Sequence, residues 1–434
     1  MGETFDLSAF TLLNSVKMMW QAKVYPLSFI IALFSGVWPS SKIIGMAVCW
    51  FMPLNKLSFK KRESFLRFLD AVGKWSLIDS YFLLLMLVAF SFDIDLKLFG
   101  MSMSFKIFVT PLFNFYNFVT ATMLSLILTH IVIHYHRKTH ELSVQKQLDQ
   151  QSLIQANEMK ICLGQGQTQF QKYFVLLVGT AGLILLISGY VLPMYTFTFE
   201  GLAGYALGED SSYIYSLLSL GILIPFKTDD PYTFGIRYLQ VLYFLFTFFI
   251  PFAFFTLVLV LQYINIKLKY AKNLFAIAEI LYAWSSIDVL ALALISSLLQ
   301  IRKFAQYMIG DKCQGINNII AVLKKLYPNK FDFEGDTCFD VKTSLNMATT
   351  LLIAVSVILF VFGTFVIRKQ QKYLYEKLKE NQIISLNTII DNHNVKSIAK
   401  QQDNIQYVKY QQQSSIFMEN NQKLDNINIS IKDQ

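Results

Sequence analysis

The sequence predicts an all-α, polytopic helical membrane protein. Hydrophobic residues make up 54% of the chain, 39 residues are phenylalanine and only 15% are charged, whereas globular proteins average about 25% charged residues. A helix needs about 20 apolar residues to span a bilayer. A soluble helical core could imitate one or two such stretches, but not seven. The seven predicted spans are Leu27–Met52, Ser76–Phe92, Ile107–Ile133, Tyr173–Pro193, Tyr238–Tyr263, Trp284–Ile301 and Leu345–Ile367.

An internal repeat indicates that the helical architecture is duplicated. Four residues recur at an offset of 209 positions where an apolar run begins: Trp75, Ser76, Ile78 and Asp79, then Trp284, Ser285, Ile287 and Asp288. An acid also lies five residues before each tryptophan. We interpret this as a duplicated four-helix module. The first copy has only three spans, so we expect that the first helix of module one is missing, through truncation or a misassigned start.

The spans divide the chain into five expected segments. The last segment contains 18 Asn and Gln residues between positions 381 and 434, a composition typical of disorder. The five segments are an outer N-terminal segment (1–24), a first membrane module (25–134), a cytoplasmic linker (135–172), a second membrane module (173–368) and a disordered cytoplasmic tail (369–434).

The charges of the loops predict the orientation in the membrane. Lys and Arg near span ends stay on the cytoplasmic side. Loops 53–75, 134–172 and 264–283 are basic, as are the residues after the last span, whereas loop 194–237 is acidic. Loop 302–344 is mildly basic and fits the pattern less well. We therefore expect the N-terminus outside and the C-terminus inside; the sequence does not distinguish the plasma membrane from an endomembrane.

The cysteines predict one disulfide and no metal site. Cys313 and Cys338 lie in the same predicted outer loop, and two cysteines in an oxidising compartment favour a bridge. No Cys-x-x-Cys pair is present, which excludes a zinc ribbon. His130 and His134 share a helix face, but no Cys, Asp or Glu follows before Glu141, so we predict no metal and no cofactor.

Several motifs resemble the paraquat-inducible protein A family, in particular its eukaryotic microbial branch. They are the run Gly73-Lys74-Trp75-Ser76-Leu77-Ile78-Asp79 after a basic segment, Pro39-Ser-Ser-Lys42 on the preceding span, Ser285, Ile287 and Asp288 in the second copy, and Phe304-Ala-Gln-Tyr-Met-Ile-Gly-Asp311 with a nearby Cys. The resemblance implies a two-module membrane protein that takes part in lipid transport between membranes, beside a partner protein. The zinc ribbons that precede each module in bacterial members are absent.

The repeated serine and aspartate have two readings. In the first, Ser76 and Asp79, like Ser285 and Asp288, form capping boxes at helix starts, and Trp75 and Trp284 lie at the lipid–water boundary. In the second, Asp79 and Asp288 line a polar path between the modules, with Lys42 as the partner of Asp79.

Motifs for other functions are lacking. We find no Gly-rich phosphate loop, no metalloprotease His-Glu pair and no Ser-His-Asp order that fits the topology, so we expect neither an enzyme nor a nucleic-acid partner. A seven-helix receptor or a membrane scaffold stays an alternative to lipid transport. Against the receptor, the third span ends His-Ile-Val-Ile-His-Tyr-His-Arg, without an Asp-Arg-Tyr motif.

The predicted orientation can be tested by cysteine labelling in intact cells. Single cysteines introduced into 194–237 or into the N-terminal segment should react with an impermeant reagent, because those segments are expected outside. Cysteines introduced into 53–75 should react only after permeabilisation. Labelling of 53–75 from outside would overturn the orientation.

Overall fold

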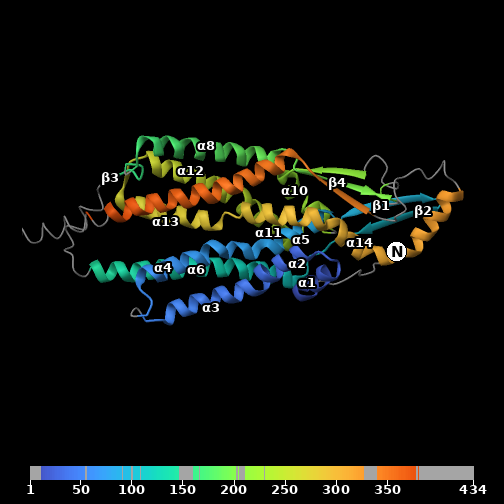
Figure 1. Cartoon of the computed structure of the whole chain (residues 1–434), viewed down its shortest axis with the longest axis horizontal. Helices are drawn as coiled ribbons and strands as arrows, with labels where there is room; N and C mark the ends of the chain where they lie inside the picture. The colour runs from blue at the N-terminus through green and yellow to red at the C-terminus, as the bar shows by residue number, and fades with distance from the viewer. Residues whose placement is uncertain are drawn as a thin grey trace, which may run out of the picture.

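The computed structural model describes a long bundle of helices (Figure 1). The described residues are 11–53, 56–89, 91–98, 101–107, 109–145, 160–165, 167–201, 204, 211–228, 230–326, 340–377 and 380. Among them, seven helical segments are long and apolar enough to span a membrane: Tyr25–Phe51, Phe59–Ala89, Phe113–Thr139, Gln169–Val191, Phe234–Tyr263, Leu268–Tyr307 and Met347–Lys377. The predicted fold class is therefore confirmed.

Two of the spans contain a π-helical turn that ends two residues before a proline. The first span consists of α2 (Tyr25–Ile31), η1 (Ala32–Val37) and α3 (Trp38–Phe51), and the fifth of α11 (Phe234–Phe244), η5 (Leu245–Phe249) and α12 (Ile250–Tyr263). Proline has no N–H and its ring clashes with the carbonyl four residues earlier. That carbonyl belongs to Ser35 before Pro39 and to Thr247 before Pro251, both within the wider π turn. The π turns are the physical response to the prolines.

Two other spans are broken near their middle. The second consists of α4 (Phe59–Gly73), the 3-10 turn η2 (Lys74–Leu77) and α5 (Ile78–Ala89). The sixth consists of α13 (Leu268–Trp284) and α14 (Ile287–Leu326), with Ser285 and Ser286 between them. The breaks fall at matching positions of the sequence repeat.

Most of the predicted cytoplasmic loops next to these breaks are helical. The loop predicted at 53–75 is largely α4, and the loop predicted at 264–283 is largely α13. The charges suggested loops, but α4 buries Leu66 and Leu69 together with the charged residues Glu63 and Asp70. The remaining spans are also longer than predicted, since α6 (Phe113–Gln145) enters the predicted linker and α14 enters the predicted loop 302–344.

Short strands, which the sequence did not predict, occupy the two ends of the bundle. The hairpin is β1 (Phe92–Leu98) with β2 (Met101–Ile107), the smallest sheet is β3 (Lys160–Ile161) with β6 (Ile266–Lys267), and the third has the order β5 (Ser212–Tyr215), β4 (Tyr195–Glu200), β7 (Asp340–Leu345). All pairings are antiparallel. In β4, alternate aromatic residues point into the core, as strand geometry requires. Their alternation with threonine was the signal that the hydropathy analysis missed.

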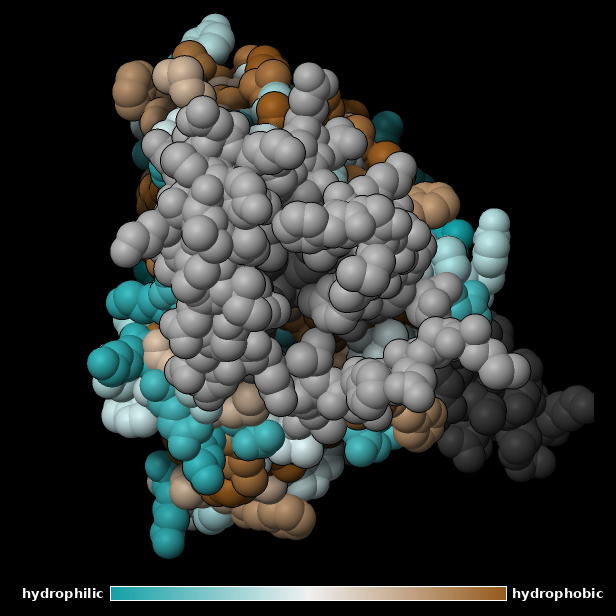
Figure 2. Space-filling model, turned by 90° about the vertical axis from the view of Figure 1, so that its right-hand side faces the viewer, coloured by the Kyte–Doolittle hydropathy of each residue, from teal (hydrophilic) through white to brown (hydrophobic). Residues whose placement is uncertain are grey.

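The strand pairings show which connections share an end of the molecule. The β3–β6 sheet joins the segments after α6 and α12 at one end, and the β5-β4-β7 sheet lies at the other, beside β1 and β2 (Figure 1). This grouping matches the alternation of loops predicted from charge. Viewed from the β-sheet end, hydrophobic residues are exposed along the sides of the molecule (Figure 2), as expected for helices that face lipid.

The core runs through both halves of the chain, and short elements complete it at the β-sheet end. There α1 (Leu12–Gln21) packs on α2. The apolar stretch after β5 forms α10 (Leu217–Leu223) and the 3-10 turn η4 (Pro225–Lys227), and α10 packs on α8 (Gln169–Val191). The fully buried side chains of Leu217 and Leu220 fix α10 there.

The predicted disulfide is not supported. Cys338 lies outside the described residues, and for Cys313 the structure describes only the backbone of α14. Cys49 and Cys162 are buried free thiols. The predicted disordered tail also lies almost wholly outside the described residues, although its first residues, 369–377, continue the last helix.

Two glycines of α8 give a matched test of helix packing. A Cβ on Gly182 would lie 2.7 Å from Cε1 of Phe255, a fully buried ring, whereas a Cβ on Gly189 would lie 3.7 Å from its nearest neighbour, Cβ of Leu351. Gly182→Ala should therefore lower the free energy of unfolding by about 1–3 kcal/mol through overpacking. Gly189→Ala should raise it by up to about 1 kcal/mol, the helix-propensity gain. Thermal unfolding in detergent measures both, and equal effects would contradict the packing of α8 on α12.

Candidate functional site

The candidate site lies where the two broken helices face each other. α5 and η2 both pack on α14, and α4 packs on α13. The π turns lie beside the breaks, because η1 contacts η2 and η5 contacts α14. Irregular backbone is tolerated within a membrane protein only where other protein groups or water satisfy it. The centre of the bundle is therefore the place to look for polar side chains.

A buried ion pair joins the two breaks. Nζ of Lys74 lies 2.8 Å from Oδ2 of Asp288, and the two side chains are 8% and 15% exposed. The same ammonium group donates to the backbone carbonyl of Ser285 at 2.9 Å. Lysine has three N–H donors, so one side chain both neutralises the acid and satisfies a carbonyl at the helix break.

Hydroxyl groups complete the contact beside the ion pair. The side chains of Tyr81 and Ser286 are hydrogen-bonded to each other, and both are buried. The backbone N–H of Ser286 donates to the carbonyl of Phe246 in the π turn at 3.2 Å. At the break in the second half, the polar groups of Ser285 and Ser286 thus bond partly to the π turn of the same half and partly to Lys74 and Tyr81 of the first half.

A second charged group lies further along the same interface. Arg137 of α6 donates from Nη1 to Oε2 of Glu279 at 2.6 Å and from Nη2 to Oε1 at 3.2 Å. Its Nε also donates to Oε1 of Glu63 at 2.9 Å. Arg67 pairs with Glu63 one helical turn away. The guanidinium fork of Arg137 thus binds one acid from each half of the chain.

Between these groups lies a chain of three polar side chains. The indole Nε1 of Trp284 donates to Nε2 of His130 at 2.6 Å. The same His130 nitrogen lies 3.3 Å from Oδ1 of Asp70, and both of these side chains are mostly buried. We call the whole set the central seam: Glu63, Arg67, Asp70, Lys74, His130, Arg137, Glu279, Trp284 and Asp288.

Of the residues predicted from the repeat, Asp288 and Trp284 belong to the central seam and Ser285 touches it through its carbonyl. Asp79 is the second residue of α5, half-buried and in none of the ion pairs that the structure describes. The indole of Trp75 stacks on Phe34, with ring centroids 5.1 Å apart. Both tryptophans lie near the middle of candidate membrane-spanning segments, Trp75 within Phe59–Ala89 and Trp284 at the end of α13 within Leu268–Tyr307. Their position relative to a lipid–water boundary stays a prediction.

The capping interpretation is wrong for both serines. Ser76 lies inside the 3-10 turn that links α4 to α5 without a gap, so no helix begins there. Ser285 is the C-cap residue of α13, and its buried hydroxyl has no hydrogen-bond partner. At Ser76, where the sequence predicted the N-terminus of a new helix, the 3-10 turn η2 instead continues the helical backbone from α4 into α5.

The predicted pairing of Lys42 with Asp79 is also wrong. The ammonium group of Lys42 is fully buried and donates to the carbonyl of Ser125 at 3.2 Å. The acid that interacts with it electrostatically is Asp70. Gly73 makes room for it, because a Cβ there would lie 2.6 Å from Nζ. The rotation of α4 about its axis, which sequence spacing does not determine, selects Asp70.

Sequence reasoning missed most of the central seam, although one signal was present. The acids noted five residues before each repeated tryptophan are Asp70 and Glu279, and both belong to it. His130 was considered only as a metal ligand beside His134, and no cluster of three or more potential metal ligands occurs in the described part of the chain. His134 instead contacts the ring of Tyr135.

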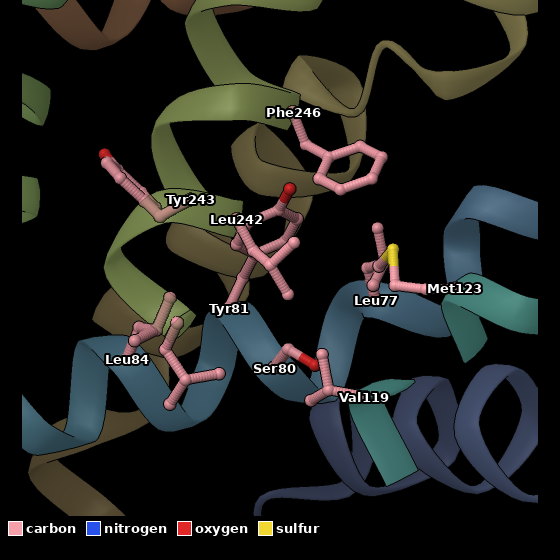
Figure 3. A pocket seen from close by; sticks show the side chains of 10 residues that line it. Leu77, Ser80, Tyr81, Leu84, Val119, Met123, Leu242, Tyr243 and Phe246 are labelled. Atoms are coloured by element: carbon pink, nitrogen blue, oxygen red, sulfur yellow. The ribbon is translucent and has the colours of Figure 1, made fainter. Parts of the chain in front are cut away.

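A small cavity borders the seam on the α5 side. Its volume is about 20 Å³, room for roughly one water molecule, and its lining includes Leu77, Ser80, Tyr81, Met123 and Phe246 (Figure 3). The hydroxyl of Ser80 is buried there without a hydrogen-bond partner. The cavity lining is thus mostly apolar, and its polar residues are Ser80 and Tyr81 of α5 and Tyr243 of α11.

Comparison with known families agrees with the two-part arrangement. The family model for Paraquat-inducible protein A matches residues 4–132 and 232–314. The chain belongs to the paraquat-inducible protein A family. The matched segments include both broken helices up to position 314, and with them every residue of the central seam except Arg137. Comparisons with curated proteins and with solved structures give no match.

The Lys74–Asp288 pair gives a direct test of the interface. Lys74→Met leaves a buried carboxylate without its cation and should lower the free energy of unfolding by about 3–5 kcal/mol. The double variant Lys74→Met with Asp288→Leu removes both charges and should recover most of that loss. Lys377→Met breaks a surface pair with Glu380 and should leave the free energy of unfolding nearly unchanged, because water screens such pairs. Thermal unfolding in nanodiscs measures all three; additive losses in the double variant would contradict the pair.

Proposed function

We propose that this member of the paraquat-inducible protein A family moves lipids or other hydrophobic molecules across or between membranes, together with a partner protein. The observation that carries the proposal is the central seam, in which charged groups from both halves of a helical membrane protein meet away from water. Ionisable residues at membrane depth are costly and usually mark a functional path. The family match supports the same class of function.

The architecture supports a transporter-like scaffold rather than a receptor. Broken helices that face each other near the middle of the bundle are typical of transport proteins. The matching breaks, the matching π turns and the two matched segments support the duplicated module inferred from sequence. In this proposal the protein is not an enzyme. A partner or an ion gradient would supply the energy.

The proposed orientation keeps the C-terminus in the cytoplasm. At the end of the bundle opposite the β5-β4-β7 sheet, the last span carries Arg368, Lys369 and Lys372, and α4 begins with Lys60 and Lys61 close behind its first residue. Basic residues at one end of several spans indicate the cytoplasmic side.

Substitution of the two repeated acids tests the function. Asp79→Asn keeps the shape of the side chain and removes the charge, and because Asp79 has no described ion pair, the fold should persist. If Asp79 lines the lipid path, movement of a fluorescent phospholipid in proteoliposomes should fall at least about tenfold, the effect of roughly 1.4 kcal/mol on a barrier. Asp288→Asn, by contrast, should lower stability as well, because it leaves Lys74 unpaired.

The control is the conservative change Ser80→Ala, next to Asp79, which should leave lipid movement intact. Wild-type protein that moves lipid no faster than empty vesicles, with and without a cell membrane extract as a source of partner, would contradict the proposed function. Unchanged movement in both aspartate variants would remove these residues from the path.

A further inference from the structure

The donors and acceptors at the contact of Trp284, His130 and Asp70 determine which nitrogen of the His130 imidazole carries its proton. The indole N–H of Trp284 can only donate. It lies 2.6 Å from Nε2 of His130, so this nitrogen acts as an acceptor and carries no hydrogen. The imidazole is therefore neutral, with its proton on Nδ1.

The same nitrogen faces a carboxyl oxygen. Oδ1 of Asp70 lies 3.3 Å from Nε2 of His130, and within the described part of the structure no other group donates to this buried oxygen. An ionised carboxylate has only acceptor sites. Two acceptors facing each other in a low-dielectric interior repel, so one of them must carry a proton. A proton on Nε2 is excluded, because it would face the Trp284 donor.

We propose that Asp70 is a proton-binding site, at which the O–H of a neutral carboxyl on Oδ1 and the indole N–H of Trp284, from the other half of the chain, share the single lone pair of Nε2 of His130 in a three-centre hydrogen bond. Asp70 comes from α4, His130 from α6 and Trp284 from α13. The bound proton is thus part of the contact between the two halves of the chain.

The cations near Asp70 determine what its carboxylate can pair with once the proton has been released. Lys74 is paired with Asp288, and Arg137 is held between Glu63 and Glu279, so neither cation is available to Asp70.

Lys42 from α3 is the remaining cation. It is fully buried and bonded to a backbone carbonyl, with no carboxylate at ion-pair distance in the described structure. When Asp70 releases its proton, the carboxylate loses its hydrogen bond to His130 and is attracted to Lys42. The acid then turns away from the interface with the second half.

A direct measurement is the infrared carbonyl band of a protonated carboxyl group, recorded on full-length protein in nanodiscs at neutral pH. The wild type should show such a band. Asp70→Asn should remove it, whereas Asp340→Asn, a change in an acid that is paired with Arg302 outside the central seam, should leave it in place. His130→Phe removes the acceptor and should shift the band to higher frequency. A wild-type spectrum without the band, or a band that survives Asp70→Asn, would overturn the proposal.

A second measurement uses stability and does not need a resolved band. The amide of Asn donates to His130 much as a protonated Asp does, so Asp70→Asn should unfold at the wild-type temperature at neutral pH. Wild-type stability should fall as pH rises, because the folded protein binds this proton more tightly than the unfolded chain does; Asp70→Asn should lack that component. If Asp70→Asn is instead as unstable as Asp288→Asn, Asp70 is ionised and the proposal is wrong. Neither measurement depends on lipid movement, so each can fail or succeed apart from the proposed function.

Discussion

The structure depends on one electrostatic constraint: a charge buried among apolar helices must find its partner there, and here the partner often belongs to the other half of the chain. Lys74 is neutralised by Asp288, and Arg137 lies between Glu63 and Glu279. Separating the halves within a bilayer would leave Lys74, Asp288 and Glu279 without these partners, at a cost of several kcal/mol per ion. The central seam therefore sets the register of the two halves more sharply than apolar packing, which lipid can replace.

The irregular backbone at the centre follows from the same constraint. A break in a helix exposes carbonyl and N–H groups that lipid cannot satisfy. At the second break, the carbonyl of Ser285 receives Lys74, and the N–H of Ser286 donates to the carbonyl of Phe246 in the π turn. The π turn itself exists because Pro251 follows it. A proline in one span thus supplies the acceptor that a broken helix in another span requires.

The sequence predicted the spans well because span length is set by the bilayer and needs no knowledge of neighbours. It failed where neighbours decide. The segment 53–75 is charged, yet it forms a helix because α6 and α13 supply partners for its acids and arginines. The strands of the β5-β4-β7 sheet are too short for hydropathy windows, and β7 pairs with a segment far away in the chain.

The candidate site shows the same division. The repeat pointed to Asp288 and Trp284 because both copies have the same motif, and both lie in the seam. It could not reveal that Lys74 is the partner of Asp288, since pairing depends on how two helices rotate against each other. His130 and Arg137 lie on α6, outside the repeated motif, so no spacing argument connected them with Asp70 or Glu279.

The repeat is symmetric in sequence but not in charge, and this difference separates the roles of its two aspartates. Lys74 has Ala283 as its counterpart, so a cation exists to meet Asp288 but none at the equivalent position to meet Asp79. The side chain of Ala283 is buried, which leaves no room there for a lysine without repacking. Asp288 is therefore committed to holding the halves together, and replacing it disturbs the fold before it disturbs any path. Asp79 is half-buried and outside the described ion pairs, so it does not hold the two halves together in this way. A loss of function at Asp79 with the fold intact would consequently report on the path itself, whereas a loss at Asp288 would not.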